Sequence, residues 1–386
     1  MNNPVIVVHI ITGLSNGGAQ MMLLKLLTDM NKARFPVCVV SLREKGALGA
    51  EIEAMGVPVY DLGMYRIVDM PMAAWRFFRI IRKVRPNLIQ GWMYHGNLAA
   101  SLAGLFTAKR VPVLWNVRQS LATLDAEKPL TAIIIRLCAR FSAKTARVIY
   151  NSYTAARQHE ELGYRSAKTA IISNGFNIQI FKPDSDARVL IRRELRVREE
   201  SMLIGLVARY HPMKDHETFL QAAALLSQVY PTIYFVLVGD GVDESNPKLS
   251  ELVEKFNLKA RVLMLGGRKD IPKINAALDV AVNVSWRGEA FSNSLGEAMA
   301  CGIPCVVTDV GDSAWVLGET GKVIPARNSE ALSTAIQELL DAGLQSRQML
   351  GTLARQRVKE NFSIEYVAKQ YSTLYEQCVS EGKFLL

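Results

Sequence analysis

Short apolar runs alternate with amphipathic segments of helical spacing along almost the whole chain. The runs at residues 5–10, 37–42 and 202–208 are each followed by a polar or glycine-containing loop and then by a helix pattern. Strands that alternate with helices in this way build parallel sheets with helices on both faces. We therefore predict an α/β protein made of doubly wound parallel sheets.

The length of the chain indicates two domains. At 386 residues it exceeds the roughly 250–300 residues at which a single core stops growing. A polar segment at residues 174–186, with glycine and proline, has the composition of a linker. We place the first domain at residues 1–180 and the second after it.

Cysteine usage and the N-terminus indicate the cellular compartment. The five cysteines are odd in number and form no C-x-x-C pair, which predicts reduced thiols buried as small apolar residues. No apolar run approaches the roughly 18 residues of a membrane span, and residues 1–4 lead directly into a strand pattern. We expect a cytoplasmic protein.

The positive charge lies in the first half of the chain. The net charge is +10; residues 1–180 hold 22 Lys and Arg against 10 Asp and Glu, and the remainder holds 24 against 26. A basic face attracts phosphates, acidic polymers or anionic lipid headgroups, and charge alone does not choose among them. Residues 75–85 alternate apolar with basic side chains. They suit a membrane-surface helix or a crossover helix with solvated arginines.

Two glutamates bracket the loop after one buried strand. Residues 279–284 form the strand pattern, Glu289 follows it, and Glu297 lies in a helix expected from Ser294 to Cys301. Open parallel sheets bind ligands beyond the carboxyl ends of their strands. A second interpretation is local, because Ser294-x-x-Glu297 also matches a capping box.

Other polar groups follow strands of the first domain. Gly17 and Gly18 belong to a glycine-rich loop that opens a helix, which suits an anionic or hydroxyl-rich ligand or a tight turn. The G-x-G-x-x-G fingerprint is absent, which disfavours an NAD-dependent oxidoreductase. His95, Asn97 and Arg118 also follow strand patterns, so we expect them at the same ligand edge.

Two cations follow the first strand of the second domain. Arg209 and Lys214 are separated by a loop that could fold both toward one diphosphate; the alternative is solvated surface charge. Asp184-Ser185-Asp186 is formally a D-x-D motif, but it also precedes a helix that carries Arg188 and Arg192. We predict that it caps that helix, and we predict no metal site.

Four sequence blocks together resemble one enzyme family. They are residues 13–20 (GLSNGGAQ), 173–177 (SNGFN), 207–215 (VARYHPMKD) and 289–304, which holds E-x7-E followed by AMACGIP. This combination resembles the retaining glycosyltransferases of family 4. The resemblance implies the GT-B fold, in which two Rossmann-like domains face a cleft, with the donor domain at residues 181–365. It also implies a C-terminal helix, residues 366–386, that crosses back to the N-terminal domain.

The resemblance also assigns roles in the second domain. Arg209 and Lys214 would bind the donor diphosphate and stabilise the leaving nucleotide, Glu297 would bond the ribose, and Glu289 would hold the transferred sugar. Further donor contacts would come from the backbone near Arg268, from the helix that starts near Ser294, and from the backbone of Ala290, Phe291 and Ser292.

In the first domain, Gly17 and Gly18 would approach the donor and His95 would lie near the reacting centre. Asn97 and Arg118 are candidates for the acceptor side. The sequence departs from the family pattern at Gln20, Asn177 and Gly288, which limits any transfer of donor identity.

The expected function is that of a retaining, metal-independent glycosyltransferase. It would move a sugar from a UDP- or GDP-linked donor to a hydroxyl of a glycan or lipid-linked acceptor in cell-surface polysaccharide biosynthesis. The nucleotide-sugar is a substrate, so we expect no cofactor, and we expect no nucleic-acid partner. An anionic membrane surface, on the inner face, is a hypothetical partner of the basic domain. Alternatives are a GT-B sugar-nucleotide epimerase or hydrolase and a non-catalytic nucleotide- or glycan-binding module.

Overall fold

The chain divides into two compact units. The computed structural model describes residues 3–15, 17–107, 110–121, 124 and 127–383. Unit 1 comprises residues 1–175 together with 364–386, and unit 2 comprises residues 176–363. The units therefore meet in the chain at Gly175 and Phe176, five residues before the boundary placed from sequence.

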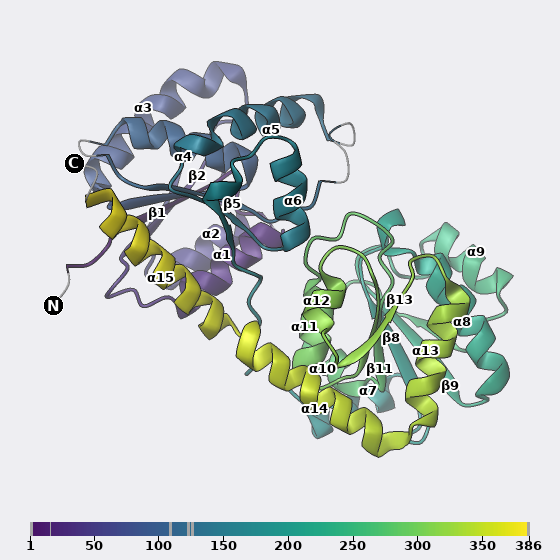
Figure 1. Ribbon diagram of the computed structural model, residues 1–386. Coiled ribbons are helices and arrows are strands. Elements are labelled where there is room, and N and C mark those ends of the chain that lie inside the picture. Colours follow the sequence, from purple (N-terminus) through teal and green to yellow (C-terminus); the bar gives the residue numbers. More distant parts are fainter. Residues whose placement is uncertain (1–2, 16, 108–109, 122–123, 125–126, 384–386) are drawn as a thin grey trace. The chain divides into compact units, whose positions relative to one another are not determined.

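The described part of unit 1 contains a seven-stranded parallel sheet in the order β3-β2-β1-β4-β5-β6-β7 (Figure 1). Its strands are β1 (Val7–Ile11), β2 (Val37–Ser41), β3 (Val59–Asp61), β4 (Leu88–Trp92), β5 (Val113–Val117), β6 (Arg147–Tyr150) and β7 (Thr169–Ile171). Its helices are α1 (Gly18–Asp29), α2 (Gly46–Ala54), α3 (Met70–Val84), α4 (Met93–Leu105), α5 (Pro129–Phe141), α6 (Tyr153–Glu161) and α15 (Ile364–Lys383).

Helices cover both faces of this sheet because successive residues of its buried strands point to opposite sides. Val7 and Val39 pack with α1, α2 and the C-terminal helix α15. Val8 and Val40 pack with α3 and α4 on the other face. The C-terminal helix is therefore part of the core of unit 1, and Figure 1 shows it (yellow) running along α1.

The described part of unit 2 contains a six-stranded parallel sheet in the order β10-β9-β8-β11-β12-β13. Its strands are β8 (Met202–Val207), β9 (Ile233–Val238), β10 (Val262–Met264), β11 (Val280–Asn283), β12 (Cys305–Thr308) and β13 (Gly321–Ile324). Its helices are α7 (Ser185–Glu194), α8 (His216–Val229), α9 (Pro247–Lys255), α10 (Ile271–Ala277), α11 (Asn293–Ala300), α12 (Ser313–Leu317), α13 (Ser329–Asp341) and α14 (Gly343–Asn361).

The same alternation builds two cores in unit 2. One contains Ile204, Leu206 and residues of α8, α9 and α13. The other contains Leu203, Val236 and residues of α7, α10, α11 and α14. The prediction of two doubly wound parallel sheets is confirmed.

Each sheet has one point at which the strand order reverses. In unit 1 this switch point lies between β1 and β4, and in unit 2 it lies between β8 and β11. Ligands of open α/β sheets bind beyond the carboxyl ends of the strands at such points. The loops that follow these four strands are therefore where a site is expected.

Several local expectations can be compared with the structure. All five cysteines are free and buried, as predicted. Residues 92–97, expected as a loop, are mostly helical because α4 begins at Met93. The strands β7 and β13 were not predicted. Across the described residues, every helix is too short or too polar to span a membrane.

Candidate active site

An ion pair joins the two strands of the switch point in unit 2. The ammonium of Lys214, in the loop after β8, donates to Oε2 of Glu289, in the loop after β11. Their side chains are only 17% and 10% exposed. A partly buried pair at this position brings together two residues that the sequence analysis had assigned to one site.

The loop that carries Lys214 is fixed by its neighbour. The backbone N–H of Trp286 donates to the carbonyl of Met213 at 3.0 Å, and its indole Nε1–H donates to the carbonyl of Pro212 at 2.9 Å. Asp215 has a left-handed backbone (φ +48°) and its carboxylate accepts from the N–H of Thr218, which caps α8. The backbone of Lys214 is therefore fixed by Trp286 on the residues before it and by the start of α8 on the residue after it.

Glu289 is supported by residues that the sequence analysis missed. Ser285 donates to its Oε2 at 2.8 Å, and Thr308 of β12 donates to the carbonyl of Ser285 at 2.5 Å. Gly311 (φ +62°) packs so closely that a Cβ there would lie 2.0 Å from the carbonyl oxygen of Glu289. The signal for these contacts is weak in the sequence, because they depend on β11 and β12 being neighbours.

The helix after Glu289 begins earlier than predicted. Its N-cap is Ser292, whose hydroxyl accepts from the N–H of Leu295 at 3.4 Å. Ser294 and Glu297 therefore lie inside α11, and the capping-box interpretation is wrong. Glu297 is half-buried and lies two residues beyond the position that a capping glutamate would occupy in this helix.

Three consecutive amides precede this helix. The side chains of Ala290 and Phe291 are buried, and Phe291 stacks on Phe176 with ring centroids 6.0 Å apart. The N–H groups of Ala290, Phe291 and Ser292 donate no hydrogen bond to any described residue. Free amides at a helix N-terminus favour a negative or hydroxyl-rich group.

Arg209 and Arg268 differ in how they are engaged. Arg209 is exposed and forms no ion pair or hydrogen bond with the described residues. Arg268 is held by Glu194 at 2.6 Å and by Asp270 at 2.7 Å, which together raise its pKa. The guanidinium of Arg268 is thus committed within unit 2, and only its backbone is available for the predicted contact with a base.

At the switch point of unit 1, α1 begins in the predicted glycine loop. Gly17 is the N-cap of α1 with an extended backbone (φ −173°). A Cβ at Gly18 would meet no described atom within 4 Å. The fold itself does not require glycine at position 18, so the predicted close approach of a ligand stays a prediction.

His95 lies in the first turn of α4 at the same switch point. The helix is pressed against β1, because a Cβ at Gly96 would lie 2.6 Å from the carbonyl oxygen of Ile10. Burial and then repulsion from Arg43 lower the pKa of His95, which favours the neutral imidazole. Its ring forms no hydrogen bond with any residue that the structure describes.

Asn97 and Arg118, the acceptor-side candidates, have structural contacts. Asn97 is fully buried, and its amide exchanges hydrogen bonds with the backbone N–H and carbonyl of Asn116 at 3.1 and 3.3 Å. It therefore joins α4 to β5.

The guanidinium of Arg118 donates to neutral oxygens from three parts of unit 1. These acceptors are Asn116, Tyr371 of α15, the carbonyl of Ile172, and Asn174. Every N–H of the guanidinium is used in these bonds. These contacts show that both side chains hold unit 1 together, and their assignment to the acceptor side stays a prediction.

The D-x-D motif has the role predicted for it. Asp184 is the N-cap of α7, and its carboxylate accepts from the N–H of Ala187 at 2.8 Å. Within the described ranges no group of three or more His, Cys, Asp or Glu is arranged to hold a metal ion.

Comparison with protein families identifies the chain. The family description "Glycosyltransferase Family 4" matches residues 16–180, and "Glycosyl transferases group 1" matches residues 201–342. The chain belongs to glycosyltransferase family 4. It is thus a glycosyltransferase, and the matched segments cover the whole sheet of unit 2 and every strand of the unit 1 sheet except β1.

This family 4 glycosyltransferase has relatives of known or assigned activity. It is 26% identical over 339 residues to the UDP-Gal:alpha-D-GlcNAc-diphosphoundecaprenol alpha-1,3-galactosyltransferase of Escherichia coli, covering 85% of this chain and 84% of that one. It is 28% identical over 223 residues to the lipopolysaccharide core biosynthesis mannosyltransferase LpsB of Rhizobium meliloti, covering 55% and 62%.

Solved structures confirm the fold of the glycosyltransferase. Anabaena Alr3699/HepE in complex with UDP is 21% identical, with a TM-score of 0.82 over 96% of this chain and 99% of that one. A glycosyltransferase from Rickettsia africae is 17% identical, with a TM-score of 0.85 over 98% and 99%. At these identities the likeness concerns the fold alone, which is GT-B.

Proposed function

We propose that this glycosyltransferase moves a sugar from a nucleoside-diphosphate-sugar, UDP- or GDP-linked, to a hydroxyl of a glycan or lipid-linked acceptor in cell-surface polysaccharide biosynthesis. The observation that carries the donor assignment is the Lys214–Glu289 pair at the switch point of unit 2. The E. coli relative, named for a UDP-Gal donor and a diphosphoundecaprenol-linked acceptor, supports the acceptor class.

The proposed donor site uses cations where other enzymes use a metal. A departing nucleoside diphosphate gains negative charge, which Lys214 and Arg209 can stabilise together with the free amides before α11. Glu289 would accept from hydroxyls of the transferred sugar, and Glu297 from the ribose. The proposal therefore includes metal independence. Retention of configuration rests on the family resemblance alone.

Ligand-dependent thermal stability tests this proposal. A panel of nucleotide-sugars, UDP, GDP and NAD would be screened on the full chain, because a ligand at 100 times its Kd adds about 2.7 kcal/mol of stability. We expect a shift with UDP or GDP in the presence of EDTA, and none with NAD. A nucleotide shift that depends on a divalent cation would contradict metal independence.

A transfer assay separates the proposed activity from its alternatives. With the donor found in the panel, product would form only when a glycan or lipid-linked acceptor is added. Release of free sugar or an epimer at a rate independent of acceptor would instead support the hydrolase or epimerase alternative. Binding without any turnover would support a binding module.

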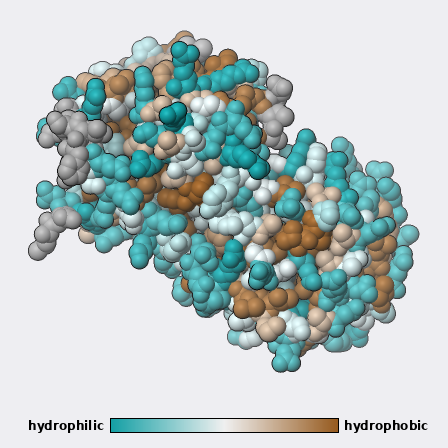
Figure 2. Space-filling model, viewed as in Figure 1, coloured by the Kyte–Doolittle hydropathy of each residue, from teal (hydrophilic) through white to brown (hydrophobic). Residues whose placement is uncertain are grey.

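The surface of unit 1 supports a membrane partner for the same reaction. Helix α3 buries Ala73, Phe77 and Ile81 and exposes its arginines, as expected of a crossover helix. Figure 2 shows hydrophobic residues (brown) intermixed with hydrophilic ones (teal) over this unit. The exposed large apolar side chains of α3 and α5 are Met70, Met72, Trp75, Leu130, Ile133, Leu137 and Phe141.

Apolar side chains beside arginines suit the interface of an anionic membrane. We therefore extend the proposal to peripheral binding at the inner membrane face. The protein should sediment with anionic vesicles at low salt and be released at high salt. Trp75→Ser should weaken this binding, and Met349→Ser, an exposed apolar position of unit 2, should not. No sedimentation at low salt would contradict the extension.

A further inference from the structure

Trp286 forms a fixed platform beside the Lys214–Glu289 pair. It lies three residues before Glu289, and its two hydrogen bonds to Pro212 and Met213 hold it against the loop of Lys214. The side chain is half-buried. An aromatic ring held in this way can present its face to a cation.

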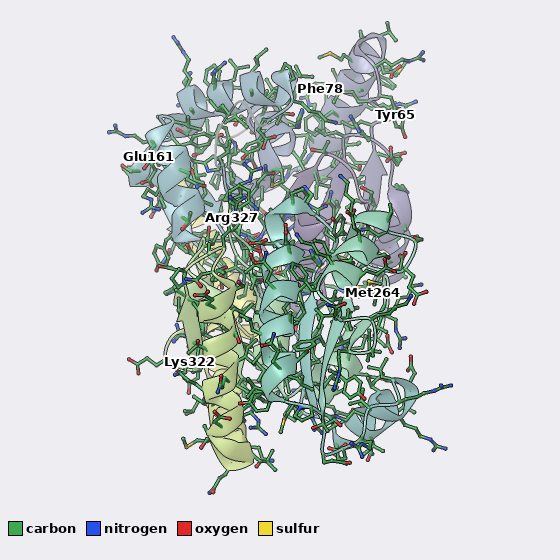
Figure 3. All side chains as sticks on the ribbon, turned by 90° about the vertical axis from the view of Figure 1, so that its right-hand side faces the viewer. Tyr65, Phe78, Glu161, Met264, Lys322 and Arg327 are labelled. Atoms are coloured by element: carbon green, nitrogen blue, oxygen red, sulfur yellow. The ribbon has the colours of Figure 1, made fainter. Side chains whose placement is uncertain are left out.

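Two arginines lie over this one ring. The guanidinium carbon of Arg287 is 4.2 Å from the ring centroid, and that of Arg327 is 3.6 Å from it. Arg327 lies in the segment after β13, the strand that contains Lys322. Figure 3 labels both residues. The left-handed backbone of Arg327 (φ +58°) is unfavourable for arginine.

Among the described residues, these two cations have no acidic partner. Arg287 and Arg327 are exposed, and neither forms an ion pair or hydrogen bond within the described part of the chain. The carboxylate of Glu289 already accepts hydrogen bonds from Lys214 and Ser285. Asp309 follows the neighbouring strand β12 and forms no ion pair with either arginine.

Further positive charge surrounds the platform. The pKa of His211 is lowered first by burial and then by repulsion from Arg209, Lys214 and Arg287, so all three cations lie within electrostatic range of His211. Clustered like charges repel unless an anion joins them. The guanidinium fork matches a carboxylate or phosphate in a bidentate manner.

We propose that Arg287 and Arg327, on the Trp286 platform, form a second anion subsite. It binds a carboxylate or phosphate carried by a sugar substrate, in addition to the donor diphosphate. The inference rests on the proposed function for the position of the donor, with Lys214 and Arg209 left to the diphosphate. It makes the two arginines specificity-determining residues for an acidic sugar.

Matched ligand pairs test the proposal by isothermal titration calorimetry on the full chain. One arm compares UDP-glucuronate with UDP-glucose, or GDP-mannuronate with GDP-mannose if GDP is the nucleotide that binds. The other arm compares glucose 6-phosphate with glucose, with and without the nucleoside diphosphate. We expect the acidic member of at least one pair to bind about tenfold more tightly. The first arm assigns the anion to the donor and the second to the acceptor.

The double variant Arg287→Ala/Arg327→Ala should abolish that preference and leave the affinity for UDP or GDP within about twofold. Arg198→Ala is the matched control, because Arg198 is an exposed arginine of the same unit, near the amino end of β8. It should leave the preference unchanged.

Two results would overturn the proposal. The first is that no acidic ligand binds better than its neutral partner. The second is that the double variant weakens UDP or GDP itself as much as the acidic ligand, which would assign the arginines to the diphosphate. If the wild type binds no nucleotide, the proposed function fails. Arginine-dependent binding of glucose 6-phosphate alone would in that case still support the subsite.

Discussion

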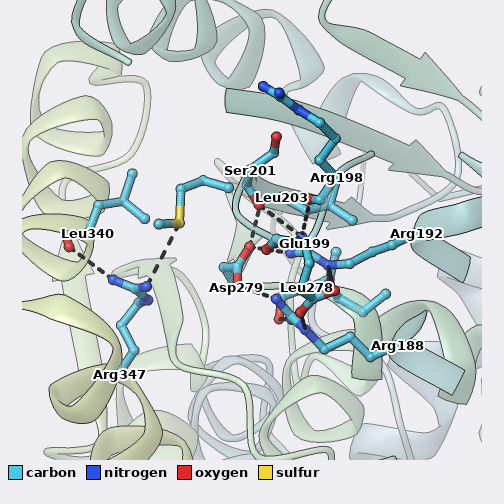
Figure 4. A network of polar contacts seen from close by, with 12 residues as sticks. Arg188, Arg192, Arg198, Glu199, Ser201, Leu203, Leu278, Asp279, Leu340 and Arg347 are labelled. Carbon is cyan, nitrogen blue, oxygen red and sulfur yellow. Dashed lines mark hydrogen bonds and ion pairs between the residues drawn. The ribbon is translucent and has the colours of Figure 1, made fainter. Parts of the chain in front are cut away.

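Ion pairs lie at both ends of the central strands of unit 2. They differ in how many hydrogen-bond and charge partners surround them. At the amino ends of β8 and β11, Arg192 pairs with Asp279 at 2.5 Å, and Asp279 also accepts from Arg188 and from the N–H of Leu203 (Figure 4). At the carboxyl ends, Lys214 pairs with Glu289, while Arg209 forms no ion pair or hydrogen bond with the residues that the structure describes. The first pair holds the sheet together, and the second is open to a ligand.

Burial and hydrogen bonding explain the difference. Arg192 is 2% exposed and also donates to the carbonyls of Ala277, Arg198, Glu199 and Ser201. A buried charge needs this many partners because desolvation is costly. Around Lys214, by contrast, a cation and three amides remain without partners among the described residues, which is an arrangement that a bound diphosphate would complete.

The largest expected effect is the loss of stability when the Arg192–Asp279 pair is broken. Asp279→Ala would leave the buried Arg192 with a 4.0 Å contact to the exposed Glu199 as its only ion pair among the described residues, and breaking a buried pair costs about 3–5 kcal/mol. We expect urea unfolding to show a loss of this size. A loss below about 1 kcal/mol would mean that the network at the amino ends does not stabilise the sheet.

The second-largest expected effect is a loss of stability on acidification, through His216 at the carboxyl ends of these strands. Burial lowers the pKa of His216 to about 4, with Lys214 adding repulsion, whereas the unfolded value is about 6.5. The folded state binds this proton less readily, so the stability from neutral His216 is present above pH 6.5 and is lost as the pH falls toward 4.

The loss from His216 should be on the order of 3 kcal/mol. Urea unfolding at pH 7 and pH 4 would compare the wild type with His216→Gln, and the variant should lose less stability on acidification. Equal losses in the two proteins would remove His216 from this account. His9 and His159 are also buried with lowered pKa values, so both proteins retain a shared acid response.

A smaller effect is expected at Glu297. Glu297→Gln keeps the shape of the side chain and removes its charge, so we expect about a tenfold loss in donor affinity with little change in stability. Thermal shift with and without nucleotide measures both quantities. Unchanged donor affinity would remove Glu297 from the proposed ribose contact.

Strands and buried helices could be predicted from sequence because their apolar patterns are local. The strands expected at residues 37–42, 202–208 and 279–284 agree with β2, β8 and β11 to within one residue at each end. The start of α4 was missed because Gly96 looks like a loop residue, whereas it is the close contact with β1 that requires glycine there. The N-cap of α11 was placed two residues late for a similar reason, since Ser292 and Ser294 offer equal local signals.

The contacts of the site depend on strand order, which the sequence does not contain. Lys214 and Glu289 are 75 residues apart and meet because β8 and β11 are neighbours. The burial of Asn97 against β5 likewise follows from the pairing of β4 with β5. Polar residues at strand exits could therefore be selected as candidates, but their partners could not.

The central claim is that the two ends of β8 and β11 have separate roles, and one calorimetric comparison tests it. Binding of UDP and GDP would be measured on Lys214→Ala and Asp279→Ala, each at a temperature where it is folded. We predict that Lys214→Ala loses at least about a hundredfold in affinity and less stability than Asp279→Ala does, whereas Asp279→Ala keeps its affinity. Wild-type affinity in Lys214→Ala, or equal losses in both variants, would contradict the account.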